Sequence, residues 1–546
     1  MKESGGIGRR RFLAGTVAAG TAATVLGPAA LVPAQAAPAT AAGTETAGFG
    51  PVAITPADGR YRDLVRGLNP RYVADPEAIY VADSTASVIE VVRKAVNEGK
   101  RLTVRSGGHC VEDFVFNPEV QVVLDLSEMN RVYFDAERGA VAVEPGAILM
   151  DVYDRLYKAW GVTIPAGIIY SIGAGGHFAG GGHGFLSRMH GMAVDHLHAV
   201  EVVVVDARGG VRKVVATREH NDPNRDLWWA HTGGGGGNFG VVTRYWFRSP
   251  GARGNDPRRI LPQPPAEVLF AGLGLPWADF TKEKFTRLLK NYSAFHEKHK
   301  HPDSPYLALT GGLGLPLRSA GPIGMGTQVD ATHPDAERLL ERYHAEILDG
   351  VAPNAKPHVT RMPWLRSTLQ RATTNSQAND PALRSDFKSA MMRGTMPDSQ
   401  IDALYRYLTR TDVDNPTISV SFLSFGGRIN AVGRNDTAFP HRDCSLNLLW
   451  TVIWNDPADD AKFVGWNREF YGAVYAETGG VPVPNGVTGG SYVNDADTDL
   501  ADPRFNTSSA AWHDLYYRDN YSRLQQVKAK WDPRNFFRHK LSVRLP

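Results

Sequence analysis

Three glycine-rich segments in the first half of the chain contain the residues most suited to binding a cofactor. They are Ser106-Gly107-Gly108-His109, the stretch 173–184 and the stretch 233–240. Glycine adopts positive φ angles and lets backbone N–H groups come close to phosphate oxygens. Three such segments in one half of a chain indicate a dinucleotide held by backbone groups.

The third segment formally contains a G-x-G-x-x-G pattern, from Gly235 to Gly240. A Rossmann site needs a strand before this pattern and a helix after it. Here the residues that follow, 241–247, predict a strand, so the match is accidental. The sequence also lacks G-x-x-x-x-G-K-[ST], which excludes a P-loop.

Histidines and cysteines offer less specific signals. His109 alone could be an ordinary loop histidine, and the pair His196-x-His198 could face one way on a strand and bind a metal. No cysteine pair or carboxylate accompanies that pair at ligand spacing, so we expect no metal site. Cys110 and Cys444 allow at most one disulfide and exclude a cysteine-rich zinc module.

Short elements are expected to position these segments. Ser84-Thr85 can cap a helix that Gly99 stops, and a strand at 102–104 runs into the loop 105–110. The other elements expected in this half are strands at 122–124, 140–143, 200–205 and 241–247 and a helix at 148–159.

After a Pro/Gly/Arg-rich boundary at 251–265 the pattern changes. Amphipathic helices are expected at 285–295, 336–348 and 401–408, with strands at 418–423 and 446–453 and a last helix at 521–531. This alternation predicts an α+β lobe with one face of a sheet open to a ligand.

The N-terminal segment has the features of an export signal. Arg9-Arg10-Arg11 precedes a weakly apolar run, and Ala34-Gln35-Ala36 fits a cleavage site, so we expect a twin-arginine signal peptide at 1–36 and secretion. A membrane anchor is the alternative. Residues 37–70 are expected to be a linker, with order beginning near Pro70.

Composition describes the rest of the chain. The 546 residues are 42% hydrophobic, and the net charge of +3 equals that of residues 1–36. We therefore expect two or three lobes, no nucleic-acid partner and no membrane contact after signal cleavage.

Several motifs together make the sequence similar to a known family. They are Val104–His109, the segments 173–184 and 227–243, Ser491-Tyr492-Val493-Asn494, and the segments 520–524 and 532–536. They resemble the FAD loops and the C-terminal segment of the vanillyl-alcohol-oxidase and p-cresol-methylhydroxylase superfamily, in its berberine-bridge-enzyme-like branch. The similarity runs from about Arg71 to Leu545.

This resemblance implies an α+β fold with a split FAD-binding domain of the p-cresol-methylhydroxylase type. By analogy, the FAD-binding domain spans 71–250, an inserted α+β substrate domain spans 251–490, and a C-terminal segment at 491–546 returns to the first domain.

The resemblance also implies that FAD is bonded covalently through His109. Relatives often add a cysteine thioether, but Ile169 stands at that position here, so a single bond is expected. The cofactor-binding residues implied are Arg105, Ser106, Gly107, Gly108, His109, Cys110, Ile169, Gly173, Gly175, Gly176, His177, Gly181, Gly182, Gly237, Asn238, Gly240, Val242 and Asn494.

The catalytic base stays open at this point. Relatives commonly have Tyr-x-Asn-Tyr, and Asp495 replaces the second tyrosine. Tyr492 is the first candidate, followed by Asp495 and Tyr170, although Tyr492 could also be plain core. On an extended strand Tyr492 and Asn494 would share a face and Asp495 would point to the other.

The function implied is an exported FAD-dependent oxidase of an alcohol, a sugar or glycosyl hydroxyl, with molecular oxygen as electron acceptor. Two alternatives are an oxidase that dehydrogenates or cyclises a secondary metabolite and a non-catalytic flavin-binding relative.

Overall fold

The computed structural model describes residues 48–374 and 379–546. The expected signal peptide, its cleavage site at Ala34-Gln35-Ala36 and the linker residues 37–47 lie outside the described residues.

The first sheet contains the strand that leads into the His109 loop. It has the order β1-β2-β4-β3, with β1 (Val52–Ile54), β2 (Ala78–Val81), β3 (Leu102–Arg105) and β4 (Val122–Asp125). Helix α2 (Thr85–Asn97) begins at Ser84, whose Oγ accepts a hydrogen bond of 3.2 Å from the Ser87 N–H. The expected start of order near Pro70 is wrong, because β1 pairs with β2 and α1 (Tyr61–Leu64) follows.

The second sheet supports the other two glycine segments. Its order is β5-β6-β9-β7-β8, with β5 (Val132–Asp135), β6 (Ala140–Val143), β7 (Leu197–Val205), β8 (Val211–Thr217) and β9 (Val241–Phe247). Helix α3 (Leu149–Trp160) ends at Gly161, which has φ +67°. Helix α6 (Arg225–Ala230) precedes the third glycine segment and β9 follows it, so the order of elements is the reverse of a Rossmann turn.

The third sheet is the largest and is antiparallel throughout. Its order is β13-β10-β12-β11-β15-β16-β14-β17, with β10 (Glu267–Leu275), β11 (Leu309–Pro316), β12 (Ile323–Asp330), β13 (His358–Pro363), β14 (Arg384–Met392), β15 (Ser419–Ser424), β16 (Leu446–Trp454) and β17 (Thr488–Gly490). The strands expected at 418–423 and 446–453 are confirmed as β15 and β16.

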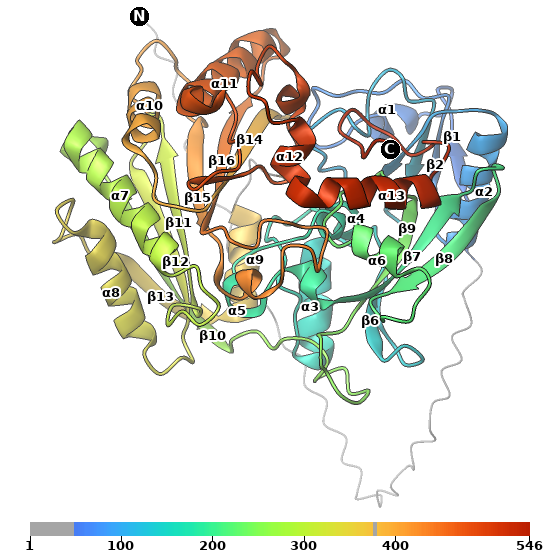
Figure 1. Ribbon diagram of the computed structural model, residues 1–546, viewed down its shortest axis with the longest axis horizontal. Coiled ribbons are helices and arrows are strands. Elements are labelled where there is room, and N and C mark those ends of the chain that lie inside the picture. The colour runs from blue at the N-terminus through green and yellow to red at the C-terminus, as the bar shows by residue number, and fades with distance from the viewer. Residues whose placement is uncertain (1–47, 375–378) are drawn as a thin grey trace, which may run out of the picture. The chain divides into compact units, whose positions relative to one another are not determined.

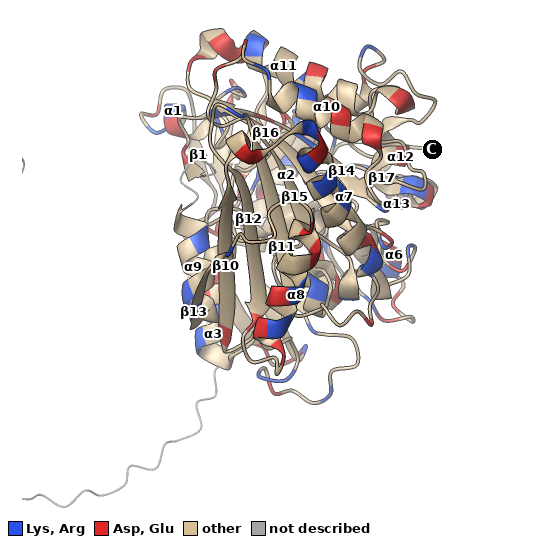
Figure 2. Cartoon of the chain, turned by 90° about the vertical axis from the view of Figure 1, so that its left-hand side faces the viewer, with Lys and Arg blue, Asp and Glu red and all other residues tan. Residues whose placement is uncertain are grey.

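Helices cover one face of this sheet, as Figure 1 shows for α7 (Lys282–Lys298), α8 (Ala336–Leu348), α10 (Asp398–Leu408) and α11 (Asp460–Val474). Tyr292 of α7 donates a hydrogen bond to the Phe422 carbonyl of β15. Figure 2 shows charged residues on α8 and α10 and few on strands β11 and β12. On the other face α9 (Trp364–Thr374) packs against β10 and β13, beside α3.

The C-terminal segment returns to the first half of the chain. Helices α12 (Trp512–Tyr517) and α13 (Tyr521–Trp531) follow β17, and α13 lies against α6 (Figure 1). The Arg523 guanidinium lies 3.8 Å from the centre of the Trp229 ring across this contact. The α+β class predicted from the sequence is confirmed. Among the described residues, no helix is long and apolar enough to cross a membrane.

Candidate flavin and active site

His109 lies at the end of β3 in a position that fixes its ring. Its Nε2 is 2.7 Å from Ser171 Oγ, and Ser171 Oγ donates a hydrogen bond of 2.7 Å to Asn379 Oδ1. Because the serine proton is given to Asn379, the serine oxygen accepts from His109 Nε2–H, which leaves Nδ1 without a proton. Burial lowers the pKa of His109 to about 4, so the ring is neutral and nucleophilic at pH 7.

The first two glycine segments pass directly against each other. A side chain on Gly107 would collide with the backbone of Gly173, and the reverse is equally true. Ser106 Oγ donates to the Pro145 carbonyl at 2.5 Å, next to Gly175. Glycine is therefore required here by the close approach of two backbones, and the second segment continues as helix α4 (Ala174–Ala179).

The C-terminal segment closes over the second glycine segment. The Gly182 N–H donates to the Tyr492 hydroxyl oxygen at 3.0 Å, and Asn494 Nδ2 donates to the same oxygen at 2.9 Å. Asn494 Nδ2 also donates to the His177 carbonyl at 3.0 Å. Gly181 has φ +122°, which leaves no room for an ordinary side-chain-bearing residue.

The third glycine segment is held by Asn238. Its Nδ2 donates to the Gly234 carbonyl at 3.0 Å, and its Oδ1 accepts from the Val543 N–H at 2.8 Å. Lys528, which is fully buried, donates from Nζ to the Asn238 carbonyl at 2.6 Å and to Asp532 at 2.7 Å. The backbone of this segment therefore depends on the last twenty residues of the chain.

Other predicted cofactor residues have structural roles in this region. A Cβ on Gly240 would lie 2.6 Å from the Val203 carbonyl, so this glycine serves the packing of β7 on β9, the strand that contains Val242. Gly237 lies against His539. Arg105 forms an ion pair with Asp125.

The segment around Tyr492 is a turn and not a strand. Strand β17 ends at Gly490, and the Asp495 N–H donates to the Tyr492 carbonyl at 3.0 Å. The expectation that Asp495 points away from the face of Tyr492 and Asn494 is wrong, because the alternation of a strand does not apply to a turn. Burial raises the pKa of the Tyr492 hydroxyl, and the nearby negative charge of Asp495 raises it further.

Asp495 shares a buried polar cluster with two residues that sequence reasoning did not select. Asn447 Nδ2 lies 3.4 Å from Asp495 Oδ2 and 3.4 Å from His183 Nε2. Asn447 is 2% exposed, and its Oδ1 is buried with no hydrogen-bond partner among the described residues. This amide oxygen can accept one more hydrogen bond, from a water or from the hydroxyl group of a ligand.

The cluster sets different protonation states. Burial raises the pKa of Asp495 to about 7, while the hydrogen bond from Asn447 opposes this change. Burial raises the pKa of Tyr492 well above its usual value and lowers that of His183 to about 4. Asp495 is therefore the group of the three that exchanges a proton near neutrality.

The remaining predicted residues lie apart from this cluster. Tyr170 is 42% exposed and makes no hydrogen bond to Tyr492 or Asp495. Ile169 is half-buried. Cys110 and Cys444 are both free, and burial raises the pKa of the Cys110 thiol to about 11.

Sequence reasoning missed Ser171, His183, Asn447 and Lys528. His183 had a usable signal, because it stands inside the second glycine segment. Asn447 had no signal in the sequence, because only the tertiary fold brings β16 next to Asp495 and His183.

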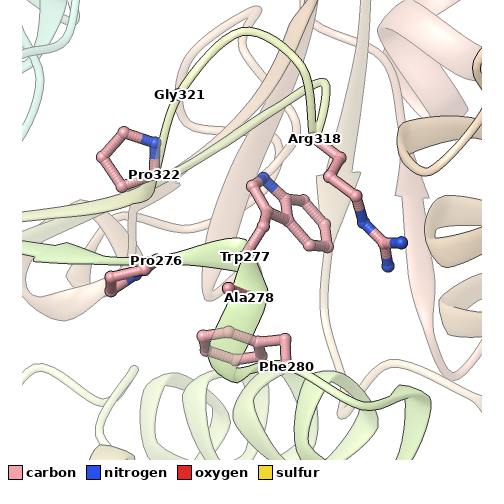
Figure 3. A pocket seen from close by; sticks show the side chains of 7 residues that line it. All are labelled: Pro276, Trp277, Ala278, Phe280, Arg318, Gly321 and Pro322. Atoms are coloured by element: carbon pink, nitrogen blue, oxygen red, sulfur yellow. The ribbon is translucent and has the colours of Figure 1, made fainter.

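A surface depression lies elsewhere, as Figure 3 shows. It is lined by Trp277, Phe280 and Arg318 with the turn at Gly321-Pro322. The paired residues Leu275 and Ile323 place it at the end of the large sheet away from Asn447. Within residues 48–374 and 379–546 no group of His, Cys, Asp and Glu side chains could hold a metal ion.

The residues present fit FAD. The glycine backbone leaves open space, since a Cβ on Gly176 would meet nothing within 4 Å. Arg105 Nε is buried without a partner among the described residues, and His109 is neutral and fixed. Fold and site together define an FAD-dependent oxidoreductase.

Comparisons with known proteins agree. The family described as "FAD binding domain" matches residues 76–214, and "Berberine and berberine like" matches residues 491–544. The chain therefore belongs to the berberine-bridge-enzyme-like family of FAD-linked oxidoreductases.

Individual relatives extend over most of the chain. Aclacinomycin-N/aclacinomycin-A oxidase of Streptomyces galilaeus is 45% identical, covering 91% of this chain and 90% of that protein. Hexose oxidase of Chondrus crispus is 31% identical over 89% of this chain and 93% of that protein. The structure of a glycopeptide hexose oxidase complexed with teicoplanin has 45% identity and a TM-score of 0.85, covering 91% of this chain and 99% of that one.

Proposed function

We propose that this protein is an exported oxidase that converts a hydroxyl-bearing carbon of a sugar or glycoside to a carbonyl. Three relatives named as oxidases of a hexose, a glycopeptide hexose or an aclacinomycin support this substrate class. The observation that carries the proposal is the buried Asp495, whose pKa of about 7 suits a base that removes a hydroxyl proton.

The chain's own residues divide the work as follows. Asp495 takes the hydroxyl proton of the substrate, and the unpaired Asn447 Oδ1 accepts a hydrogen bond from a second hydroxyl. Tyr492 stays protonated and is held in place by the Gly182 N–H and by Asn494. When bound, FAD supplies the acceptor for the hydride that leaves the same carbon. Dioxygen is the proposed final acceptor, with hydrogen peroxide as the product.

The proposed FAD attachment is a single bond through His109. Because Nε2–H is donated to Ser171, the unprotonated Nδ1 is the nitrogen that would hold the flavin at its 8α-methyl group. The remaining residues proposed for the cofactor are the glycines of the three segments together with Arg105, Ser106, Cys110, Ile169, His177, Asn238, Val242 and Asn494. The proposed domains are 71–250, 251–490 and 491–546.

The proposed location is outside the cytoplasm after removal of residues 1–36. Changing Arg9 and Arg10 together to Lys should leave the full-length protein inside the cell, while the Arg11→Lys control should be exported. Immunoblots of cell and medium fractions measure this. Unchanged export of the double variant, or a mature N-terminus at Met1, would show that the leader has another role.

A substrate panel tests the catalytic proposal. Hexoses and their glycosides are mixed with holoenzyme without oxygen, and bleaching of the flavin absorption is followed; the same panel in air is assayed for peroxide. We expect bleaching and peroxide with the same compounds. Absence of both with every sugar and glycoside would refute the proposed substrate class, and bleaching without peroxide would refute dioxygen as acceptor.

A further inference from the structure

Six glycines lie together on one face of the large sheet. Strands β10, β12 and β11 each contribute two of them, at alternate positions: Gly272 and Gly274, Gly324 and Gly326, Gly312 and Gly314. The strand register pairs them across the sheet in two rows, Gly312–Gly326–Gly272 and Gly314–Gly324–Gly274. Directly paired residues of antiparallel strands point to the same face, so all six leave that face bare. We call these six residues the glycine floor.

Neither the backbone nor the packing requires glycine at these positions. None of the six has a positive φ angle. A Cβ on Gly324 would meet nothing within 4 Å, and the nearest atoms to a Cβ on Gly272, Gly274 or Gly314 would be 3.5–3.9 Å away. Glycine weakens a strand, because it increases the conformational entropy of the unfolded chain and has no side chain that could pack on the sheet. The bare surface therefore calls for another explanation.

The floor lies on the face of the sheet opposite to α7, α8, α10 and α11, where α9 packs against β10 and β13. The alternate residues Leu313, Leu315 and Met325 are buried on the opposite face, against the helices. Gly274 is exposed, and the other five glycines are half-exposed. This is the open face that the sequence pattern predicts for the second lobe.

The floor is continuous with the proposed active site. Gly312 pairs with Leu423 of β15, and Leu423 pairs with Asn447 of β16, next to Asp495. One row of the sheet thus runs from the catalytic cluster to the floor. With strands about 4.8 Å apart, the first glycine lies about 10 Å from Asn447, which is enough for one sugar ring.

An aromatic edge borders the floor. A Cβ on Gly326 would lie 3.4 Å from the Phe270 ring, and the Arg371 guanidinium lies 3.9 Å from the centre of that ring. Arg371 also lies 4.3 Å from the Phe185 ring, and its Nη2 is buried with no hydrogen-bond partner among the described residues. The edge therefore offers one flat apolar surface and one unused donor.

We infer that the glycine floor binds the planar aglycone of a glycoside whose sugar lies over Asn447 and Asp495. The bare area measures about 10 Å across the three strands, which lie about 4.8 Å apart, and about 7 Å along each strand, from residue i to i+2. This is the size of two or three fused rings. A planar ring system can lie flat on bare peptide groups, which side chains would prevent. Arg371 Nη2 donates to an oxygen at the rim of the ring system. This inference rests on the proposed function for the sugar and adds the class of aglycone.

The test compares a free hexose that the panel identifies as substrate with its 4-methylumbelliferyl glycoside. In the wild-type holoenzyme we expect the glycoside to be preferred in kcat/KM by about tenfold or more, from the apolar area that the ring buries. Gly324→Leu and Gly274→Leu each put a side chain on the floor and should abolish this preference. Gly465→Leu, at an exposed position of α11 with nothing near its Cβ, is the matched control and should keep it.

Fluorescence titration with the umbelliferyl glycosides gives a second readout that does not depend on turnover. We expect Kd to rise about tenfold in both floor variants and to stay constant in Gly465→Leu. An unchanged preference and an unchanged Kd in a folded floor variant would overturn the inference, even when sugars are oxidised. Weaker binding in the floor variants with no sugar oxidised would instead refute the proposed function and leave the floor as a binding surface.

Discussion

Asp495→Asn should have opposite effects on activity and stability. The substitution keeps the size of the side chain and leaves an amide oxygen to accept the Asn447 hydrogen bond of 3.4 Å. It removes the ability to take a proton, and loss of a general base slows a reaction by roughly 10²–10⁴-fold. We expect anaerobic flavin reduction, measured by stopped flow, to slow by that factor. KM should change little, because a transition-state interaction lowers kcat.

The effect on stability follows from the raised pKa. The pKa of Asp495 rises from 3.8 in the unfolded chain to about 7 in the folded protein. Between these two pH values the folded state binds more protons than the unfolded state, so the contribution of Asp495 to the free energy of unfolding falls as pH rises. Above pH 7 the buried carboxyl is ionised, and the full energetic penalty of burying its charge is present. The difference corresponds to about 4 kcal/mol as an upper limit. The variant lacks this penalty, so it should melt at a higher temperature than the wild type at pH 8 and at the same temperature near pH 3.5.

The wild-type rate provides the third readout. The rate constant of flavin reduction should rise with pH through about 7, as Asp495 ionises. The Asp495→Asn variant should lack this rise. Tyr492 and His183 do not titrate in this range, so they should not mask the pH-dependent rise in rate. Wild-type reduction rates in Asp495→Asn, or a lower melting temperature at pH 8, would refute the assignment of Asp495 as a buried base.

Substitutions at four further residues test the surroundings. Tyr492→Phe should slow flavin reduction less than tenfold but lower the melting temperature, because two donors lose their acceptor at roughly 1–3 kcal/mol each; a 10³-fold slower reduction would make the tyrosine the base after all. His109→Ala should let acid extract FAD from folded protein, and a flavin-linked peptide in its digest would contradict the single bond. Ser171→Ala should slow covalent incorporation into apoprotein, scored by flavin fluorescence in denaturing gels, while Ser171→Thr restores it; equal rates would remove serine from that role. Lys528→Met leaves Asp532 buried without its partner, which costs roughly 3–5 kcal/mol, and an unchanged urea midpoint would show that the pair is not a buried ion pair.

The sequence was informative where a motif and its local structure coincide. The glycine segments and the helix end at Gly161 depend on backbone conformations that few other residues adopt, and the cap at Ser84 depends on a short side-chain oxygen. They could be located from residue types alone, and the strand after Gly240 was sufficient to exclude a Rossmann turn.

The catalytic cluster was harder to predict, because its members meet through tertiary structure. Tyr492 and Asp495 were placed on a strand that ends two residues earlier, so the predicted alternation of their side chains does not apply. Asn447 reaches the cluster through the register of β16, which a single sequence does not specify. The six floor glycines resemble loop residues in the sequence and become a surface only when three strands are paired.

The hydrogen bond between Asn238 and Val543 has a consequence for the order of events during synthesis. The third glycine segment receives its support from a residue three positions before the last one, and Tyr517 donates to the Gly234 carbonyl of the same segment. A ribosome must therefore synthesise the chain at least as far as Val543 before this part of the dinucleotide site can take its shape. We therefore expect FAD to be loaded after this contact has formed, and we expect loss of Val543 to act on the third glycine segment some 300 residues upstream.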